Sequence, residues 1–188
     1  MYRLTISILL FLFGYFHAHA DSLVYNLRSY NTTSGLSDNN VTCIVKDHYG
    51  FIWVGTKDGL NRFDGREFQV FQYQARSNSV CGNNISCLEI TDDSLLWIGT
   101  ASNGFCSYDY RTNQFKSFTS QNSKLRVDNI NDLVFDRRRN CLWIALNNGG
   151  LQQFDLSKMQ INPKIFSYNT YYAVAVKDSL AFFAGITE

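Results

Sequence analysis

The chain has little proline and little histidine, and it has no long apolar run after its first twenty residues. Proline occurs once among 188 residues, at Pro163. No later stretch holds the apolar period of an amphipathic helix, and none is apolar enough to cross a bilayer. Aromatic and β-branched residues are plentiful instead, and they suit a pleated, half-buried surface. The sequence therefore predicts an all-β fold.

An excess of charge of either sign is also missing. Lysine and arginine number 17 against 16 aspartates and glutamates. The surface therefore offers no electrostatic case for nucleic acid or anionic lipid as a partner. The only dense basic run, Arg137-Arg138-Arg139, falls where the chain is expected to turn, and we interpret it as a solvated hairpin tip.

Groups typical of catalysis and of metal binding are scarce. No nucleophile elbow, zinc-protease motif or phosphate loop is present. His48 is the one histidine after residue 20, and it has no carboxylate or nucleophile at a recognisable spacing, although a general base needs positioned partners. Acids such as Asp92, Asp93 and Asp136 are expected to lie exposed at strand ends rather than to bind calcium. The sequence predicts no catalytic residue, no metal and no cofactor, and it assigns no ligand-binding residue.

Five cysteines are present, and an odd number cannot pair completely within one chain. No Cys-x-x-Cys spacing exists, which argues against a zinc site. Cys43 and Cys87 hold the same place in successive copies of the repeat described below, where the third copy has Asp132. Cysteine is often simply a small buried hydrophobe. The disulfide connectivity stays open at this stage.

The first twenty residues have the organisation of a secretory signal peptide. Arg3 precedes an apolar stretch at residues 4–16, and Ala18-His19-Ala20 supplies a small-residue cleavage site. An uncleaved membrane anchor is the alternative, but a spanning helix needs about 20 apolar residues. We therefore expect cleavage after residue 20 and a mature chain outside the cytoplasm.

A block of 44 to 46 residues occurs three times in the rest of the chain, as the spacing of Trp53, Trp97 and Trp143 shows. Each copy opens with a short apolar segment, passes a polar turn and reaches the tryptophan. It then reverses at a turn containing glycine, which tolerates positive φ. A period of roughly 40 to 50 residues built from short strands is typical of propeller blades, each with four antiparallel strands.

The repeat predicts that residues 21–188 form the N-terminal part of a β-propeller with about three and a half blades. The blades are expected at residues 41–73, 85–118 and 130–168, with a partial blade at 172–188. Residues 21–30 are expected to add a lone outer strand. Propellers use four to eight blades, so three and a half cannot close a ring. We interpret the chain as the leading fragment of a longer protein, with blade faces left exposed.

An aromatic residue followed two positions later by a small one recurs in every copy. The tryptophans could serve as platforms for sugar rings, but one per blade at a fixed position favours packing between blades. The expected structural core of the repeat consists of Trp53, Gly55, Trp97, Gly99, Trp143, Ala145, Phe183 and Gly185.

Two stretches of the first copy, 35–41 (GLSDNNV) and 47–65 (DHYGFIWVGTKDGLNRFDG), resemble the two-component regulator propeller repeat. The resemblance extends over residues 22–185 and is strongest in the first copy. The third copy departs from it, with Ala145-Leu146 in place of Gly-Thr.

This resemblance implies the periplasmic sensor region of a Bacteroides-type hybrid two-component system histidine kinase. Such a receptor has two seven-bladed propellers, a further β domain, a membrane helix, a histidine kinase, a receiver and a DNA-binding output domain. It is expected to be a homodimer on the periplasmic side of the inner membrane. Its typical ligands are oligosaccharides, and it controls genes for glycan use. The kinase lies outside these residues, so no enzyme activity is expected of them, and no binding residue is carried over from the family.

Two other functions remain as alternatives. A secreted propeller lyase or hydrolase would need histidines and carboxylates that converge at the blade mouths. A non-catalytic interaction scaffold would need no reactive group. For the receptor, we hypothesise that ligand binding shifts the placement of domains across a dimer and thereby biases the kinase.

Overall fold

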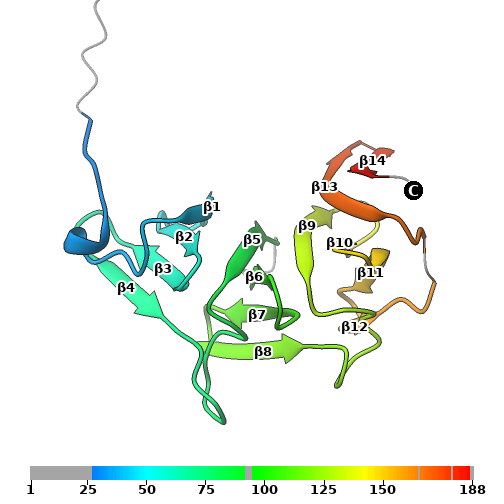
Figure 1. Ribbon diagram of the computed structural model, residues 1–188, viewed down its shortest axis with the longest axis horizontal. Coiled ribbons are helices and arrows are strands. Elements are labelled where there is room, and N and C mark those ends of the chain that lie inside the picture. The colour runs from blue at the N-terminus through cyan, green and yellow to red at the C-terminus, as the bar shows by residue number, and fades with distance from the viewer. Residues whose placement is uncertain (1–26, 92–94, 165, 179, 187–188) are drawn as a thin grey trace, which may run out of the picture.

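The computed structural model describes residues 27–91, 95–164, 166–178 and 180–186. In these residues the chain forms three four-stranded antiparallel sheets and one two-stranded sheet, which succeed one another along an arc (Figure 1). A single short 3₁₀ turn, η1 (Thr32–Ser34), precedes the first sheet. The predicted all-β fold is confirmed. The signal peptide expected at residues 1–20 lies outside the described residues.

Each sheet is a blade whose strands pair in sequence order. The first blade contains β1 (Val41–Lys46), β2 (Ile52–Thr56), β3 (Gly59–Phe63) and β4 (Phe68–Phe71). The second contains β5 (Ile85–Ile90), β6 (Leu95–Thr100), β7 (Phe105–Asp109) and β8 (Gln114–Phe118). The third contains β9 (Ile130–Asp136), β10 (Cys141–Leu146), β11 (Gly150–Asp155) and β12 (Gln160–Ile161). The fourth, as far as it is described, contains β13 (Thr170–Lys177) and β14 (Leu180–Ile186).

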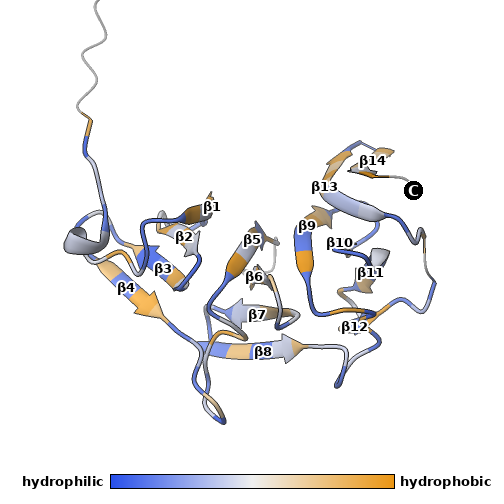
Figure 2. Cartoon of the chain, in the orientation of Figure 1, coloured by the Kyte–Doolittle hydropathy of each residue, from blue (hydrophilic) through white to orange (hydrophobic). Residues whose placement is uncertain are grey.

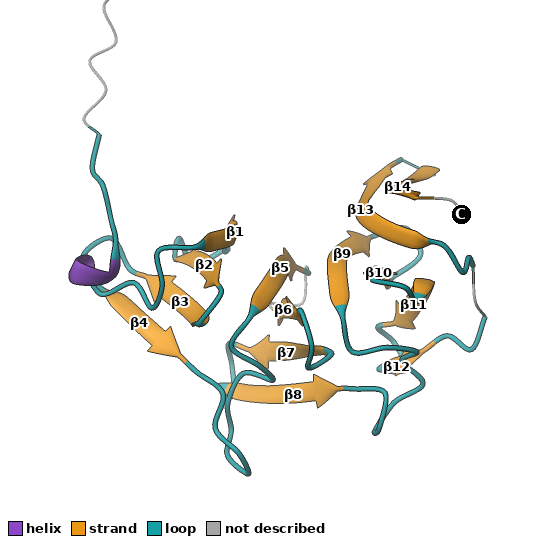
Figure 3. Ribbon diagram, in the orientation of Figure 1, coloured by secondary structure: helices purple, strands orange, loops and turns teal. Residues whose placement is uncertain are grey.

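The first strand of every blade lies on the inside of the arc. β1, β5, β9 and β13 pack against one another in that order, whereas β4, β8 and β12 lie along the outer edge (Figure 1). Figure 3 shows how the loops run from the outer strand of one blade to the inner strand of the next. This radial succession of small antiparallel sheets is the arrangement of a β-propeller.

Two distinct faces follow from the meander of each blade. The connections between second and third strands, and those between blades, emerge at one end, which we call the loop face. The connections between first and second strands, and between third and fourth, emerge at the other end, the turn face. Backbone hydrogen bonds tie the loop face together, since the amides of Gly59 and Gly104 donate to the carbonyls of Asn83 (2.7 Å) and Asp128 (2.8 Å).

The apolar core lies in the seams between blades rather than within any one sheet. Apolar residues concentrate in the strands, as Figure 2 shows. Trp53 is fully buried against Tyr108 of the second blade, with ring centroids 5.5 Å apart. Trp97 packs in the same way on Phe154 of the third blade at 5.3 Å. Trp143 packs on Phe183 of the fourth blade at 5.2 Å. Each seam therefore receives one tryptophan from the blade before it.

The small residue after each tryptophan lets the next blade approach. A Cβ added at Gly55 would lie 2.5 Å from the Sγ of Cys43 and 2.7 Å from the Cγ2 of Ile85 in the second blade. A Cβ added at Gly99 would lie similarly close to the side chains of Cys87 and Ile130. Atoms that close would overlap, so glycine is required by the cysteine on the inner strand of the same blade and by the isoleucine on the inner strand of the next.

The fourth blade shows that the expected alignment of its repeat was wrong by one residue. Every inner strand has a bulge, and the pairs that follow it are Cys43 with Gly55, Cys87 with Gly99, Asp132 with Ala145, and Ala173 with Ala184. Ala184, not Gly185, therefore holds the small position. Phe182, not Phe183, holds the tryptophan position and is 54% exposed. Because strand side chains alternate between the two faces of a sheet, Phe183 then faces the third blade, where it contacts Trp143.

Two further expectations differ from the structure. Residues 27–30, the described part of the expected outer strand, form no strand. Tyr30 instead packs edge-on against Phe63 and Phe68 at 4.9 and 5.7 Å. Asp136, expected to be exposed, is fully buried, and hydrogen bonds from Arg139 (2.5 Å) and from the Nε1 of Trp143 (3.3 Å) replace the water that its carboxylate loses. Asp92 and Asp93 lie outside the described residues.

Candidate functional site

The loop face carries a cavity of about 390 Å³ between the third and fourth blades. We call it the Tyr168 cavity. It is lined by Asn148, Tyr168, Asn169, Thr170, Tyr172 and Ile186. Its walls come from three segments: the hairpin between β10 and β11, the connection between the blades, and the ends of β13 and β14. No single stretch of sequence contains the site.

Hydrogen bonds hold the hairpin wall to the inner strand of the fourth blade. The backbone amide of Asn148 donates to the hydroxyl of Thr170 at 3.1 Å, and that hydroxyl donates to the Oδ1 of Asn148 at 2.8 Å. Asn148 has a positive φ of 55°, which asparagine tolerates better than most residues. This reciprocal pair fixes the amide side chain at the rim of the cavity.

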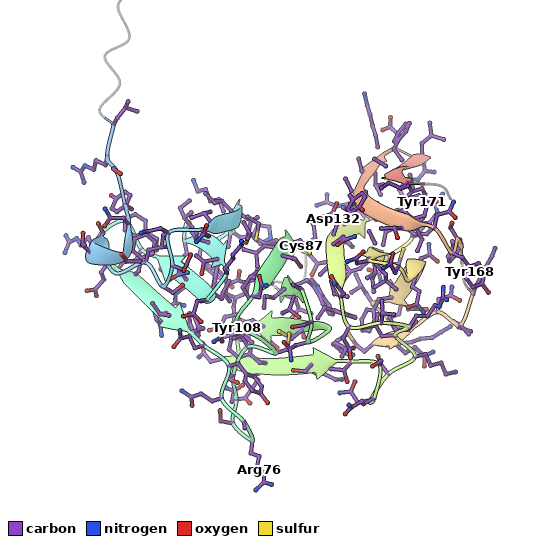
Figure 4. The ribbon with its side chains drawn as sticks, viewed as in Figure 1. Arg76, Cys87, Tyr108, Asp132, Tyr168 and Tyr171 are labelled. Atoms are coloured by element: carbon purple, nitrogen blue, oxygen red, sulfur yellow. The ribbon has the colours of Figure 1, made fainter. Side chains whose placement is uncertain are left out.

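Two tyrosines give the cavity exposed aromatic surface. Tyr168 is 69% exposed and Tyr172 is 54% exposed. The guanidinium carbon of Arg126 lies 4.6 Å from the ring centroid of Tyr168, and this cation contact covers one side of the ring. Figure 4 shows Tyr168 at the outer rim of the third and fourth blades.

The lining suits a neutral ligand that is rich in hydroxyl groups. Amide and hydroxyl side chains both donate and accept hydrogen bonds, and an aromatic ring offers an apolar face beside them. The residues that line the cavity include no acid and no base. The site can therefore orient such a ligand through hydrogen bonds and aromatic contact.

A second cavity on the loop face has a volume of about 440 Å³ and lies beside the second blade, between the connections that enter and leave that blade. We call it the Tyr73 cavity. It is lined by the segment 73–81, by Ser102 and Asn103 of the hairpin between β6 and β7, and by Thr119 and Asp128 of the connection between β8 and β9. Arg76 projects from the tip of this segment into solvent (Figure 4). Both loop-face cavities thus combine a tyrosine with amide and hydroxyl groups.

None of the residues expected to form the repeat core lines either cavity, although Gly185 is next to Ile186 of the Tyr168 cavity. Trp53, Trp97 and Trp143 are 0%, 0% and 6% exposed, so their rings are closed to any ligand. The cavity tyrosines were not singled out in the sequence because they lie at the edges of the expected blades, outside the tryptophan, small-residue and glycine positions that align between copies. A signal did exist in the run Tyr168 to Tyr172, where aromatic residues flank an asparagine and a threonine.

The polar groups singled out in the sequence are separate from these cavities. His48 is exposed in the turn between β1 and β2, and Arg137 and Arg138 are exposed in the turn after β9. Both turns belong to the turn face. Among the described residues, no three histidine, cysteine, aspartate or glutamate side chains gather in a way that would hold a metal ion.

Two buried acids connect the inner strands of neighbouring blades. Glu89 accepts a hydrogen bond from the amide of Phe135 at 3.2 Å, and Asp132 accepts one from the amide of Val174 at 2.8 Å. Burial raises the pKa of Glu89 to about 7, and the nearby Asp132 adds to the shift. Burial also raises the pKa of Asp132. Figure 4 places Asp132 near Cys87 on the inside of the arc. Their contacts are with backbone, so we assign them to joining blades.

Comparisons with known proteins identify the repeat. Residues 35–58 match the family described as two component regulator propeller. Histidine kinase P4 of Formosa agariphila is 38% identical over 66 residues, which are 35% of this chain and 5% of that protein. The resemblance of the first repeat to two-component regulator propellers is thereby confirmed.

Solved structures agree on the fold. A protein described as the extracellular domain of hybrid two component system BT3049 from B. thetaiotaomicron superposes with a TM-score of 0.77 at 21% identity. The match covers 87% of this chain and 24% of that one. U3-55K superposes with a TM-score of 0.62 at 18% identity, covering 85% of this chain and 47% of that one. The chain therefore spans a minor part of these proteins. No described helix is long and apolar enough to span a membrane.

Proposed function

We propose that this chain is part of the ligand-sensing region of a hybrid two-component receptor and that it works outside the cytoplasm. The match of residues 35–58 to the two component regulator propeller family carries the proposal. The likeness to a histidine kinase supports it, and so does the fold shared with the extracellular domain of a hybrid two component system. The kinase of such a receptor would lie in a part of the protein beyond these residues.

The ligand that we propose is an oligosaccharide bound on the loop face. Pyranose rings present C–H groups on one face and hydroxyls around the edge, and the Tyr168 cavity presents an aromatic ring beside amides and a hydroxyl. No charged residue lines the cavity, and the nearby Arg126 guanidinium is held by the Tyr168 ring and the Gly149 carbonyl, so a neutral sugar is favoured over a uronic acid or an aminosugar.

The proposed mechanism couples this site to the placement of blades and domains. Asn148 and Thr170 belong to the third and fourth blades, so a ligand that contacts both bridges a seam. In a receptor homodimer, binding that favours one arrangement of domains would bias the kinase and switch on genes for glycan use. A ligand shifts such an equilibrium only as far as it prefers one of the two states.

Binding of defined oligosaccharides to the purified full chain tests the proposal. The probes are linear xylo-, manno- and cello-oligosaccharides, with an oligogalacturonate as the acidic comparison, and calorimetry measures affinity. We expect a neutral probe to bind, and we expect Tyr168→Ala and Tyr172→Ala each to weaken it by about tenfold, a loss of about 1.4 kcal/mol.

Tyr49→Ala is the matched control, since Tyr49 is 60% exposed but lies on the turn face. It should leave affinity unchanged. Equal weakening by all three variants, or binding of none of the neutral probes, would contradict the proposed site. Shortening of a probe during the titration, seen by mass spectrometry, would favour the lyase or hydrolase alternative.

A further inference from the structure

A recurring joint attaches each of the first three blades to the segment that leads into it. The backbone amide of Ser37 donates to the Oδ1 of Asn61 on β3 at 2.9 Å. In the third blade the amide of Arg126 donates to the Oε1 of Gln152 on β11 at 2.9 Å. In each case a side chain of the third strand holds the backbone of the incoming segment. The joint sits at the loop face.

The second blade makes the same joint with two cysteines. The amide of Cys81 donates to the Sγ of Cys106 on β7 at 3.4 Å. Cys106 therefore stands where the other blades have an amide side chain, and Cys81 stands where the first blade has Ser37. Cys106 is fully buried and Cys81 is 7% exposed.

The first blade shows that the side chains at these two positions meet. The Nδ2 of Asn61 donates to the Oγ of Ser37 at 2.8 Å. A serine and an asparagine in direct contact mark a place where two side chains point at each other from the incoming segment and the third strand. The same backbone arrangement in the second blade brings two thiols together.

We propose that Cys81 and Cys106 form a disulfide bond in the mature protein. The structure holds both as thiols. The other three cysteines have different surroundings, because Cys43 and Cys87 lie on the inner strands of successive blades and Cys141 begins β10. One bond between Cys81 and Cys106 leaves three cysteines as thiols. Cys87 and Cys141 are buried, and Cys43 is partly buried.

Forming the bond removes two electrons and two protons from the pair of thiols. A disulfide donor accepts them, either an oxidoreductase of the oxidising compartment or oxidised glutathione, and is itself reduced to two thiols. The attacking species is a thiolate. Burial, and next the Cys106 sulfur beside it, raises the pKa of the Cys81 thiol. The bond is therefore expected to form while the blade is still folding and to resist reduction once the blade has closed.

The bond would act on the loop face. Cys81 lines the Tyr73 cavity, and the segment 73–81 forms one of its walls. Cross-linking that segment to β7 restricts it in the unfolded chain and holds it against its blade in the folded one. This inference rests on the geometry of the joint and stands whether or not the loop face binds an oligosaccharide.

Refolding of the full chain in a glutathione redox buffer tests the proposal. The chain is unfolded with all thiols reduced, refolded with reduced and oxidised glutathione, quenched in acid and alkylated. Cys81, Cys87 and Cys106 share one tryptic peptide, so cleavage after Glu89 and fragment-ion mass spectrometry locate the bond. We expect two of the five thiols to be protected and the bond to join Cys81 to Cys106. Cys87→Ser, the control, should form the same bond.

A second variant pair separates the bond from any effect on folding. Cys81→Ser with Cys106→Asn copies the contact of the first blade, and it should fold in reducing buffer as the unmodified chain does. Oxidation should raise the urea midpoint of the unmodified chain and leave that of the double variant unchanged. Five alkylated thiols after oxidative refolding, a bond between other cysteines, or equal midpoints for the oxidised and reduced chains would overturn the proposal.

Discussion

Replacing Phe183 with alanine should destabilise the chain, whereas the same change at Phe182 should not. The two residues are neighbours on β14 but face opposite ways. The Phe183 ring lies 5.2 Å from Trp143 and 5.9 Å from Tyr171, measured between centroids. Phe182 is 54% exposed in the tryptophan position of its blade. The pair therefore reports directly on the register of the fourth blade.

The expected magnitude follows from how much of each ring is covered. Truncating a fully buried phenylalanine to alanine costs about 3–5 kcal/mol. Phe183 is only partly buried but makes two aromatic contacts, and such a pair contributes about 0.5–1.5 kcal/mol beyond its burial. We expect a loss of about 2 kcal/mol for Phe183→Ala. An exposed substitution such as Phe182→Ala should stay within about 0.5 kcal/mol.

Urea unfolding followed by circular dichroism measures both variants in the full chain. Near-ultraviolet spectra add a local readout, because Phe183 packs on Trp143. If Phe182→Ala proved the more costly change, β14 would be shifted by one residue and Phe183 would hold the tryptophan position. Equal losses would contradict the alternation of faces on which the seam depends.

Two further predictions concern contacts made with the inner strands. Gly99→Ala should cost about 1–3 kcal/mol in urea unfolding, because the new Cβ would overlap the Sγ of Cys87 and lie 2.9 Å from the Cγ2 of Ile130; a variant as stable as the parent would show that the seam is looser than described. Burial raises the pKa of Glu89 from 4.5 to about 7, so the folded chain keeps a proton that the unfolded chain releases, and stability should fall as the pH rises through that interval. Glu89→Gln should flatten this fall and stabilise the chain at pH 8 by up to about 3 kcal/mol, the free energy that corresponds to the pKa shift; an unchanged pH profile would show that Glu89 ionises normally.

The strands and the seams could be predicted from the sequence because the copies of the repeat can be aligned with one another. A tryptophan, a small residue and a glycine turn recur at matching places in three copies, and each copy is a local pattern of alternating side chains. Such a pattern identifies a blade without knowledge of its neighbours. Blade packing then follows, since an apolar face on both sides of a sheet has to be covered.

The structure was needed where the pattern weakened. In the fourth copy the sequence aligns Gly185 with the glycine of the first two copies. The structure pairs Ala173 with Ala184 after the bulge, so Ala184 holds that position. Asp47 and Asp136 also resemble ordinary turn acids in the sequence, yet both are buried and accept a hydrogen bond from a tryptophan Nε1. The indole donor loses water in the seam, and a buried donor needs a partner.

Sequence alone determined that this protein is built from repeated four-stranded sheets, because strand periodicity and turn chemistry are local. Only the tertiary structure decided which residues gather on the loop face. Asn148, Tyr168 and Tyr172 form one cavity, and Cys81 and Cys106 form one joint, although each set is spread over several segments. The physical reason is that packing between sheets places connections, hairpins and strand ends beside one another, and that packing leaves no periodic trace in the sequence.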